Sequence, residues 1–166
     1  MKLSSFLLVS FVGFIGVNTQ NLPYPDTPFF IEHAHSEMVA SLGVTQENDD
    51  VPIILKHEND APDELWEWTT ETYIKNKKTG FYLAVEGSSQ NITVDNPIVQ
   101  SRNPQKWEYY NGALKVADLS YGITLEGGSE APNTRLVIAK LNILNKNQQF
   151  RLERLIEKQK CGETDQ

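Results

Sequence analysis

Two histidines lie close enough in the sequence to share a metal ion. In His33-Ala34-His35 the imidazoles fall on one face if the segment is a strand, and His57 is a candidate third ligand. No spacing places His57 beside the pair, so we favour a structural role on a half-exposed edge strand and predict no metal site. The acidic segments 47–50 and 58–64 lack the spacing and the glycine of a calcium loop, and we predict solvated loops there.

Nucleophiles and general bases form no catalytic set in this sequence. No nucleophile, histidine and acid can be assigned to one another, no glycine-rich phosphate loop is present, and the single cysteine, Cys161, lies near the C-terminus. A glycoside hydrolase needs two carboxyl groups facing each other across a cleft, and the sequence locates no such cleft. We therefore predict a protein that is not an enzyme and that needs no cofactor.

The charge balance argues against polyanionic partners. The chain has 15 basic and 22 acidic residues, a formal net charge of −7. Its basic residues are spread singly except for Lys75, Lys77 and Lys78, whereas nucleic-acid binding normally needs a basic stripe. The sequence therefore predicts no nucleic-acid partner.

The N-terminal segment is typical of a secretory signal. Lys2 precedes an uncharged apolar run over residues 3–17, which is shorter than the roughly 20 residues of a membrane-spanning helix. We predict a signal peptide at residues 1–19, a proline-rich leader at residues 20–28, and a secreted protein with no membrane insertion; an uncleaved anchor is the alternative.

Two other features bear on an extracellular setting. Asn91-Ile92-Thr93 is an N-glycosylation sequon, so Asn91 is a predicted glycan site on a surface turn. Cys161 lies in a charged C-terminal tail, residues 154–166, and has no partner cysteine in the chain. It leaves two alternatives open, a disulfide-linked dimer and an exposed free thiol.

A repeated motif organises the rest of the chain. A polar residue precedes an aromatic ring by two positions three times, in Glu64-Leu65-Trp66, Gln105-Lys106-Trp107 and Gln148-Gln149-Phe150. The rings are 41 residues (66 to 107) and 43 residues (107 to 150) apart, and so regular a period indicates repeated units that bury their apolar faces against one another. Upstream of each ring lie a hairpin pattern and a short apolar run. The hairpins run from Ile31 to Leu42, Ile74 to Leu83 and Leu114 to Leu125, and the apolar runs begin at Ile53, Ile98 and Leu136.

These short runs predict an all-β fold. They alternate with Gly, Pro, Asn and Asp clusters about every ten residues. Roughly four strands in each unit would give about twelve, and a closed barrel capped by hairpins leaves no exposed sheet edge. We therefore predict a β-trefoil of three pseudo-symmetric four-strand repeats, at about residues 29–70, 71–111 and 112–153, with Trp66, Trp107 and Phe150 meeting near the pseudo-threefold axis.

These residues resemble the ricin B-type lectin domain, whose three subdomains each end in a Gln-x-Trp signature. The second unit matches best, with Gln105-Lys106-Trp107 at its end. The third has Phe150 in place of tryptophan, and the first has Glu64 in place of glutamine. The resemblance covers roughly residues 29–153, and it implies a β-trefoil that binds galactose-type and related sugars without catalysis.

The resemblance also implies which positions would contact a sugar. An acid after the leucine of the first hairpin and an asparagine before the motif glutamine would bind hydroxyl groups, and a ring after the middle strand would cover the apolar face. In order, these positions read Gly43, Lys56 and Asp63 in the first unit, Ala84, Ser101 and Pro104 in the second, and Glu126, Ala139 and Asn147 in the third.

The third unit is therefore the predicted sugar site. Glu126, Asn147 and Gln148 are its candidate contacts, and Tyr121 is a candidate ring from the neighbouring hairpin. Gln105 and Gln148 also have a predicted structural role, in which a buried amide satisfies loop backbone groups beside the core ring.

A shared fold leaves the function open. The main hypothesis is a secreted lectin-like protein that binds glycans or glycoproteins through the third repeat. The alternative is a protein-binding trefoil, such as a secreted protease inhibitor, that acts through the loops at residues 45–52 and 57–63; the loss of sugar-contacting residue types in the first two units favours it. A structural protein without a small ligand is a third possibility.

Overall fold

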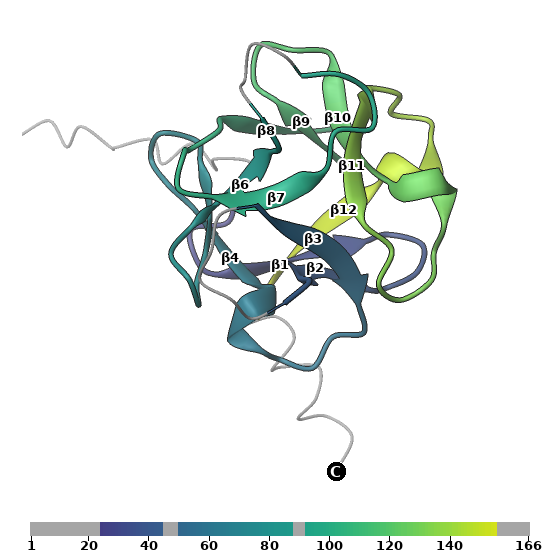
Figure 1. The fold of residues 1–166 in the computed structure, drawn as a ribbon. Helices are drawn as coiled ribbons and strands as arrows, with labels where there is room; N and C mark the ends of the chain where they lie inside the picture. The colour runs from purple at the N-terminus through teal and green to yellow at the C-terminus, as the bar shows by residue number, and fades with distance from the viewer. Residues whose placement is uncertain (1–23, 45–49, 88–91, 156–166) are drawn as a thin grey trace, which may run out of the picture.

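The computed structural model describes residues 24–44, 50–87 and 92–155, which form one body of short strands (Figure 1). The predicted signal peptide, Asn91 and Cys161 lie outside these residues. The strands of the first repeat are β1 (Phe29–His33), β2 (Val39–Leu42), β3 (Val51–Lys56) and β4 (Leu65–Trp68). Those of the second are β5 (Ile74–Asn76), β6 (Tyr82–Val85), β7 (Ile98–Ser101) and β8 (Trp107–Tyr110). Those of the third are β9 (Ala113–Val116), β10 (Tyr121–Leu125), β11 (Leu136–Lys140) and β12 (Phe150–Arg154).

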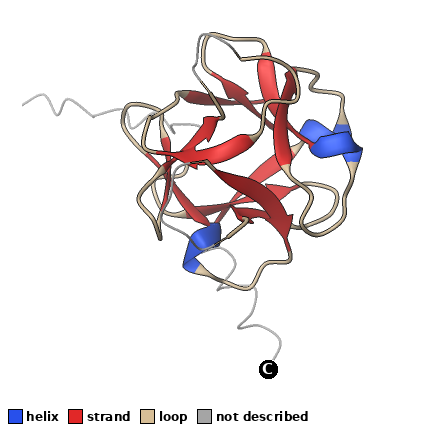
Figure 2. Cartoon of the chain, in the orientation of Figure 1, coloured by secondary structure: helices blue, strands red, loops and turns tan. Residues whose placement is uncertain are grey.

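The helical elements of the described residues are three single-turn 3-10 elements, coloured blue in Figure 2. They are η1 (Pro62–Glu64), η2 (Glu126–Gly128) and η3 (Lys146–Gln148). Turns η1 and η3 come directly before, or one residue before, the last strand of the first and third repeats. No helix in the described part of the chain is long and apolar enough to cross a membrane.

The first and last strands of the three repeats close a barrel. β1 pairs antiparallel with both β12 and β4, β4 pairs with β5, and β8 pairs with β9. The gaps in this ring are closed by the Tyr73 to Lys106 bridge and by a hydrogen bond from the Phe150 backbone N–H to the Gly112 carbonyl, 2.7 Å long. Each barrel strand therefore has neighbours on both sides, which removes the exposed edges that short strands otherwise present.

The middle strands of the repeats form a three-sided cap on this barrel. The pairs β2–β3, β6–β7 and β10–β11 are antiparallel hairpins. They meet through the β3–β7 pairing and through the bridges Pro97 to Val137 and Ile54 to Arg135. Barrel and cap together make the predicted β-trefoil, with twelve strands in three equivalent sets of four.

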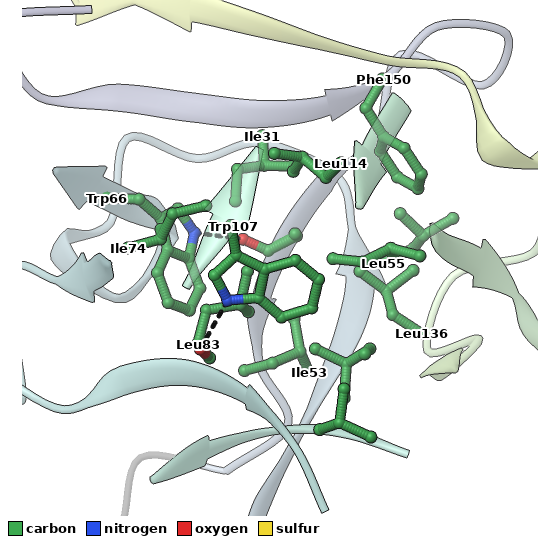
Figure 3. Close-up of a cluster of buried hydrophobic side chains, with 14 of the residues drawn as sticks. Ile31, Ile53, Leu55, Trp66, Ile74, Leu83, Trp107, Leu114, Leu136 and Phe150 are labelled. Carbon is green, nitrogen blue, oxygen red and sulfur yellow. Dashed lines mark hydrogen bonds between the residues drawn. The ribbon is translucent and has the colours of Figure 1, made fainter. Parts of the chain in front are cut away.

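One apolar cluster fills the interior. Trp66 and Trp107 are fully buried and Phe150 is 1% exposed, and all three belong to this cluster (Figure 3). The indole Nε1 of Trp66 donates to the Ala40 carbonyl at 3.0 Å, and that of Trp107 donates to the Leu83 carbonyl at 2.8 Å. The two tryptophans therefore tie the last strand of their repeats to the second strand by equivalent bonds.

Two expectations about surface residues are wrong. His33, the last residue of β1, is fully buried, because β1 pairs with three neighbouring strands. The His33 ring packs edge-on against the Phe150 ring, with 5.5 Å between the ring centroids. The acidic segment 58–64 is not solvated throughout, since Asp63 is 6% exposed and Glu64 is fully buried. Glu64 occupies the position that glutamine holds in the other two repeats. Because this position lies two residues before the core ring, the acid is buried with it.

Candidate functional site

Backbone hydrogen bonds define the equivalent acid position in each repeat. The amide after the second strand donates to a carbonyl at the start of the third strand or directly before it: Gly43 to Pro52 (2.8 Å), Glu86 to Pro97 (2.8 Å) and Glu126 to Arg135 (3.0 Å). The acid position of the second repeat is therefore Glu86, and the sequence assignment to Ala84 is wrong.

A shift of two residues explains this error. The sequence pattern ends the second hairpin at Leu83, but Val85 pairs with Ile98 as Leu42 pairs with Ile53. Leu83 and Val85 both face the core, because side chains two apart share one face of a strand. Either residue satisfies the apolar pattern, so only the pairing register separates them.

The Glu126 carboxylate is held in a fixed direction in the third repeat. Glu126 begins η2 directly after β10, and Arg135 directly precedes β11, so the two lie at one end of the same hairpin. The guanidinium donates through Nε to Oε2 at 3.0 Å and through Nη2 to Oε1 at 2.5 Å. This bidentate bond lowers the pKa of Glu126, which is therefore ionised at neutral pH. Because a carboxylate has about four acceptor sites, it keeps capacity for further donors.

Asn147 lies beside the same turn. Gly128 of η2 approaches the Asn147 side chain so closely that a Cβ on Gly128 would lie 2.9 Å from Nδ2. The Thr124 hydroxyl donates to the Asn147 carbonyl at 3.3 Å, and the Asn145 side chain accepts from the Asn147 backbone N–H at 3.1 Å. Figure 2 accordingly shows η2 and η3 side by side at the right of the molecule. The structure thus brings together the turns that carry Glu126 and Asn147. The first residues of these turns, 126 and 146, are 20 positions apart in the sequence.

One polar atom of Asn147 is left without a partner. Its Oδ1 is buried and accepts no hydrogen bond. An unsatisfied buried acceptor costs about 1–3 kcal/mol, and such groups are uncommon in native structures. A hydroxyl group that reached Oδ1 would remove this cost.

Gln148 and Tyr121 lie differently from these two residues. Gln148 is 1% exposed, and its amide bridges the β11–η3 connection by accepting from the Asn142 N–H at 2.8 Å and donating to the Lys140 carbonyl at 2.9 Å. Tyr121 begins β10, five residues before Glu126, and is half-buried against the core. At about 3.3 Å per residue, the strand puts the two roughly 16 Å apart. The structure therefore does not bring Tyr121 to the acid.

The matching region of the first repeat is occupied by its own side chains. The Lys56 ammonium donates to the Leu42 carbonyl at 2.7 Å and lies 3.6 Å from Oδ2 of Asp63. Oδ2 of Asp63 also accepts from the Ser41 hydroxyl at 3.3 Å. With glycine at the acid position and a lysine at the ring position, this repeat presents an internal ion pair instead of a carboxylate facing solvent.

The second repeat contains an open hollow. A cavity of about 650 Å³ lies between the end of β6 and the β7–β8 connection. Its lining consists of Asp50, Ala84, Val85, Glu86, Gly87, Val99, Ser101, Asn103, Pro104 and Gln105. Gln105 does not bridge its connection as Gln148 does; its Oε1 accepts from the Val85 N–H at 3.2 Å. The sequence pattern missed this hollow because the shifted register put Ala84 at the acid position.

The histidine pair forms no metal centre in the described residues, where no three metal-ligating side chains come together. His33 and His35 have ring centroids 6.2 Å apart, but His33 is buried and His35 is exposed. Nε2 of His33 lies 3.1 Å from the Lys146 carbonyl, and Nδ1 accepts from the Ser36 N–H at 3.2 Å. Both ring nitrogens of His33 are therefore engaged within the fold.

Comparisons with solved structures place this arrangement among known folds. The Rhizoctonia solani agglutinin is 17% identical, with a TM-score of 0.69, over 80% of this chain and 98% of its own. The Macrolepiota procera ricin B-like lectin in complex with lactose is 19% identical, with a TM-score of 0.66, over 77% and 95%. The earthworm R-type lectin C-half in complex with GalNAc is 16% identical, with a TM-score of 0.64, over 76% and 98%. No protein-family model and no curated protein matches the chain. At these identities the likeness establishes the β-trefoil fold that the chain shares with these lectins.

Proposed function

We propose that this protein is a secreted, non-catalytic glycan-binding protein whose third repeat contacts sugar hydroxyl groups through Glu126 and Asn147. The fold supports the proposal, because proteins of the same fold include a lectin in complex with lactose and another in complex with GalNAc. The chain's own residues support it independently. Glu126 and Asn147 have the side-chain types that bind hydroxyl groups, and they come from two turns that the fold places together.

The observation that carries the proposal is the unpartnered Oδ1 of Asn147, whose side chain lies close to the turn η2 that begins with the oriented carboxylate of Glu126. Arg135 fixes the direction of the Glu126 carboxylate, so little side-chain freedom is lost when it accepts hydroxyl groups. A neighbouring hydroxyl of the same sugar would donate to Oδ1 of Asn147 once the side chain turns this buried oxygen outward, and the acceptor would then be satisfied. Gly127 and Gly128 have no side chain that would cover a sugar, and their positive φ values, 61° and 69°, favour glycine at both positions.

Gln148 has a structural role next to this site. Its amide fixes the backbone from residue 140 to residue 142 and thereby the start of the connection that leads to Asn147. No aromatic ring occupies the ring position, which is Ala139, so the sugar's apolar face gains little coverage. A single site of this kind binds weakly, and clustered glycans would raise the apparent affinity through multivalency.

The test is a glycan array probed with the purified chain at high surface density, followed by competition with free sugar. We expect selective binding that free sugar removes, and its loss in both Glu126→Gln and Asn147→Ala. The matched control is Glu108→Gln. Glu108 also pairs with a basic residue of the third repeat, Lys115 at 2.7 Å, but it lies on the barrel strand β8. A folded protein that binds no glycan, or that binds equally well without Asn147, would overturn the proposal.

Secretion is tested separately by expressing the full chain in a eukaryotic host. We expect the protein in the medium, without residues 1–19 and with a glycan on Asn91 that an endoglycosidase removes. Retention of the intact N-terminus inside the cell would contradict this part of the proposal. A folded chain that binds no glycan would instead favour the protease-inhibitor hypothesis, which inhibition assays against a protease panel would then test.

A further inference from the structure

The hollow of the second repeat has the size of a small-molecule site. Its volume of about 650 Å³ lies within the roughly 300–1,000 Å³ that is usual for ligand pockets. Its apolar part consists of Ala84, Val85 and Val99, which are at most 5% exposed. Polar and acidic groups make up the rest of the lining. The hollow therefore combines a small apolar floor with polar groups that can fix a ligand's orientation.

A short connection explains why the hollow is open. Residues 102–106 join β7 to β8, whereas residues 141–149 join β11 to β12 and residues 57–64 join β3 to β4. The longer connections include the turns η3 and η1, and these turns pack against β10 and β2, the strands that lead to the acid position in their repeats. Pro104 and Ser101 stand at the amide and ring positions in the second repeat. The hollow thus has neither an asparagine at the amide position nor an aromatic residue at the ring position, although Asn103 lies next to the amide position in its lining.

The lining contains two acidic side chains and no basic one. Glu86 and Asp50 are both exposed, and no hydrogen bond or ion pair engages either carboxylate among the described residues. No lysine or arginine lines the hollow. Glu126 and, more weakly, Glu86 raise the pKa of the nearby Arg135, but the Arg135 guanidinium is hydrogen-bonded to Glu126. The guanidinium of Arg102 lies over the Phe81 ring at 5.1 Å. Two carboxylates against an apolar floor concentrate a negative potential that attracts cations.

We propose that this hollow binds the ammonium group of an amino sugar, a glycan unit with a free rather than an acetylated amine. An ammonium has three N–H donors, which match the carboxylates of Glu86 and Asp50 together with one neutral oxygen of the lining. Ser101, Asn103 and Gln105 supply hydroxyl and amide groups for the sugar's own hydroxyl groups. The ammonium site follows from the hollow alone, while the sugar part of the ligand rests on the proposed glycan-binding function.

The experiment compares a β-1,4-linked glucosamine trimer with its fully N-acetylated counterpart, titrated into the full chain by calorimetry at pH 6. Acetylation removes the charge and leaves the sugar ring, so we expect the free-amine trimer to bind about tenfold or more tightly. Added salt should reduce this preference, because the hollow is open to solvent. Equal binding of the two trimers would overturn the proposal.

Two substitutions locate the site. Glu86→Gln and Asp50→Asn each keep the size of the side chain and remove its charge, and we expect each to reduce the preference for the free amine. Asp50 has φ of 64°, which asparagine also tolerates. The matched control is Asp118→Asn, an exposed acid with φ of 62° in the β9–β10 turn, which should leave the preference unchanged. An unchanged preference in Glu86→Gln would place the ammonium elsewhere and overturn the assignment.

A trilysine peptide separates the ammonium from the sugar. If it competes as well as the glucosamine trimer, the hollow recognises an ammonium without its sugar, and the amino-sugar assignment is overturned.

The same measurements distinguish a failure of this proposal from a failure of the glycan-binding function proposed for the third repeat. Binding of neutral glycans that depends on Asn147 but shows no preference for free amines would contradict only the hollow. A preference for free amines that depends on Glu86, with no binding of neutral glycans, would contradict only the third-repeat site.

Discussion

Nε2 of His33, at the end of β1, donates a hydrogen bond to the carbonyl of Lys146, 3.1 Å away in η3. The bond links the first repeat to the turn of the third repeat that carries Asn147. His33 and Lys146 are 113 residues apart in the sequence. Because Nδ1 accepts from the Ser36 N–H, the ring is neutral with its proton on Nε2. A protonated His33 would lose the acceptor for Ser36 and would bring a second cation toward the ammonium of Lys146.

We expect this histidine to make the fold less stable in acid. Burial lowers the pKa of His33 below its usual value of 6.5, so the unfolded chain takes up a proton before the folded chain does. The stabilising contribution is complete above pH 6.5 and is lost as the pH falls toward the lowered pKa. Urea unfolding at pH 7.5, 6.5 and 5.5 should show a smaller pH dependence in His33→Gln than in the native chain. The control is the exposed His35→Gln, and an equal pH dependence in all three proteins would contradict this account.

We expect Glu64→Gln to stabilise the fold. The Glu64 carboxyl is fully buried, and Oε2 accepts from the Asn59 and Ala61 N–H groups while Oε1 has no partner. An amide keeps the accepting oxygen and replaces the unsatisfied oxygen with a donor, as in Gln148, so a gain of about 1–3 kcal/mol in the free energy of unfolding is expected at neutral pH.

The pH dependence of this gain tests its cause. Burial raises the pKa of Glu64 above 4.5, so the native chain loses stability as the pH rises through the raised pKa, and the glutamine variant does not. The gain should therefore be larger at pH 8 than at pH 5 in urea unfolding. Exposed Glu71→Gln is the control. A gain that does not depend on pH would show that removal of the charge is not its source.

We expect Gly128→Ala to impair the third-repeat site more than Gly127→Ala. Both glycines have positive φ, 69° and 61°, so both alanines carry a similar backbone strain. Only at Gly128 would the new Cβ meet Asn147, 2.9 Å from Nδ2, whereas nothing lies within 4 Å at Gly127. Glycan binding should fall in Gly128→Ala and persist in Gly127→Ala, at similar melting temperatures. Equal binding in the two variants would mean that the position of Asn147 does not matter.

We expect Trp107→Ala to cost about 3–5 kcal/mol of unfolding free energy, because it removes a fully buried core ring. Trp107→Phe should cost less, since Phe150 shows that the position accepts a smaller ring, but it leaves the Leu83 carbonyl without the indole donor. Urea unfolding of the two variants gives both values. A cost for Trp107→Phe as large as that for Trp107→Ala would mean that the hydrogen bond, rather than the ring, dominates.

The repeat spacing predicted the fold well and the site only in part. Rings at 66, 107 and 150 indicated three units, and the structure confirms twelve strands in three sets with these rings in one core. The assignment of Ala84 was wrong because Leu83 and Val85 satisfy the apolar pattern equally. The burial of Glu64 and His33 was also missed, since an acid and a histidine in a polar stretch read as surface residues. The roles of Glu126 and Asn147 in sugar binding stay predictions.

The sequence by itself determined the period, the strand content and the core rings, because these follow from residue types repeated at regular intervals along one chain. The tertiary structure decided what the intervals leave open: which residue of a strand faces which partner, how closely η2 approaches η3, and whether a connection fills or exposes the space beside it. The strand register, the approach of η2 to η3 and the hollow of the second repeat all depend on how segments distant in sequence lie relative to one another. They depend on hydrogen bonds and packing between repeats, which no single segment specifies.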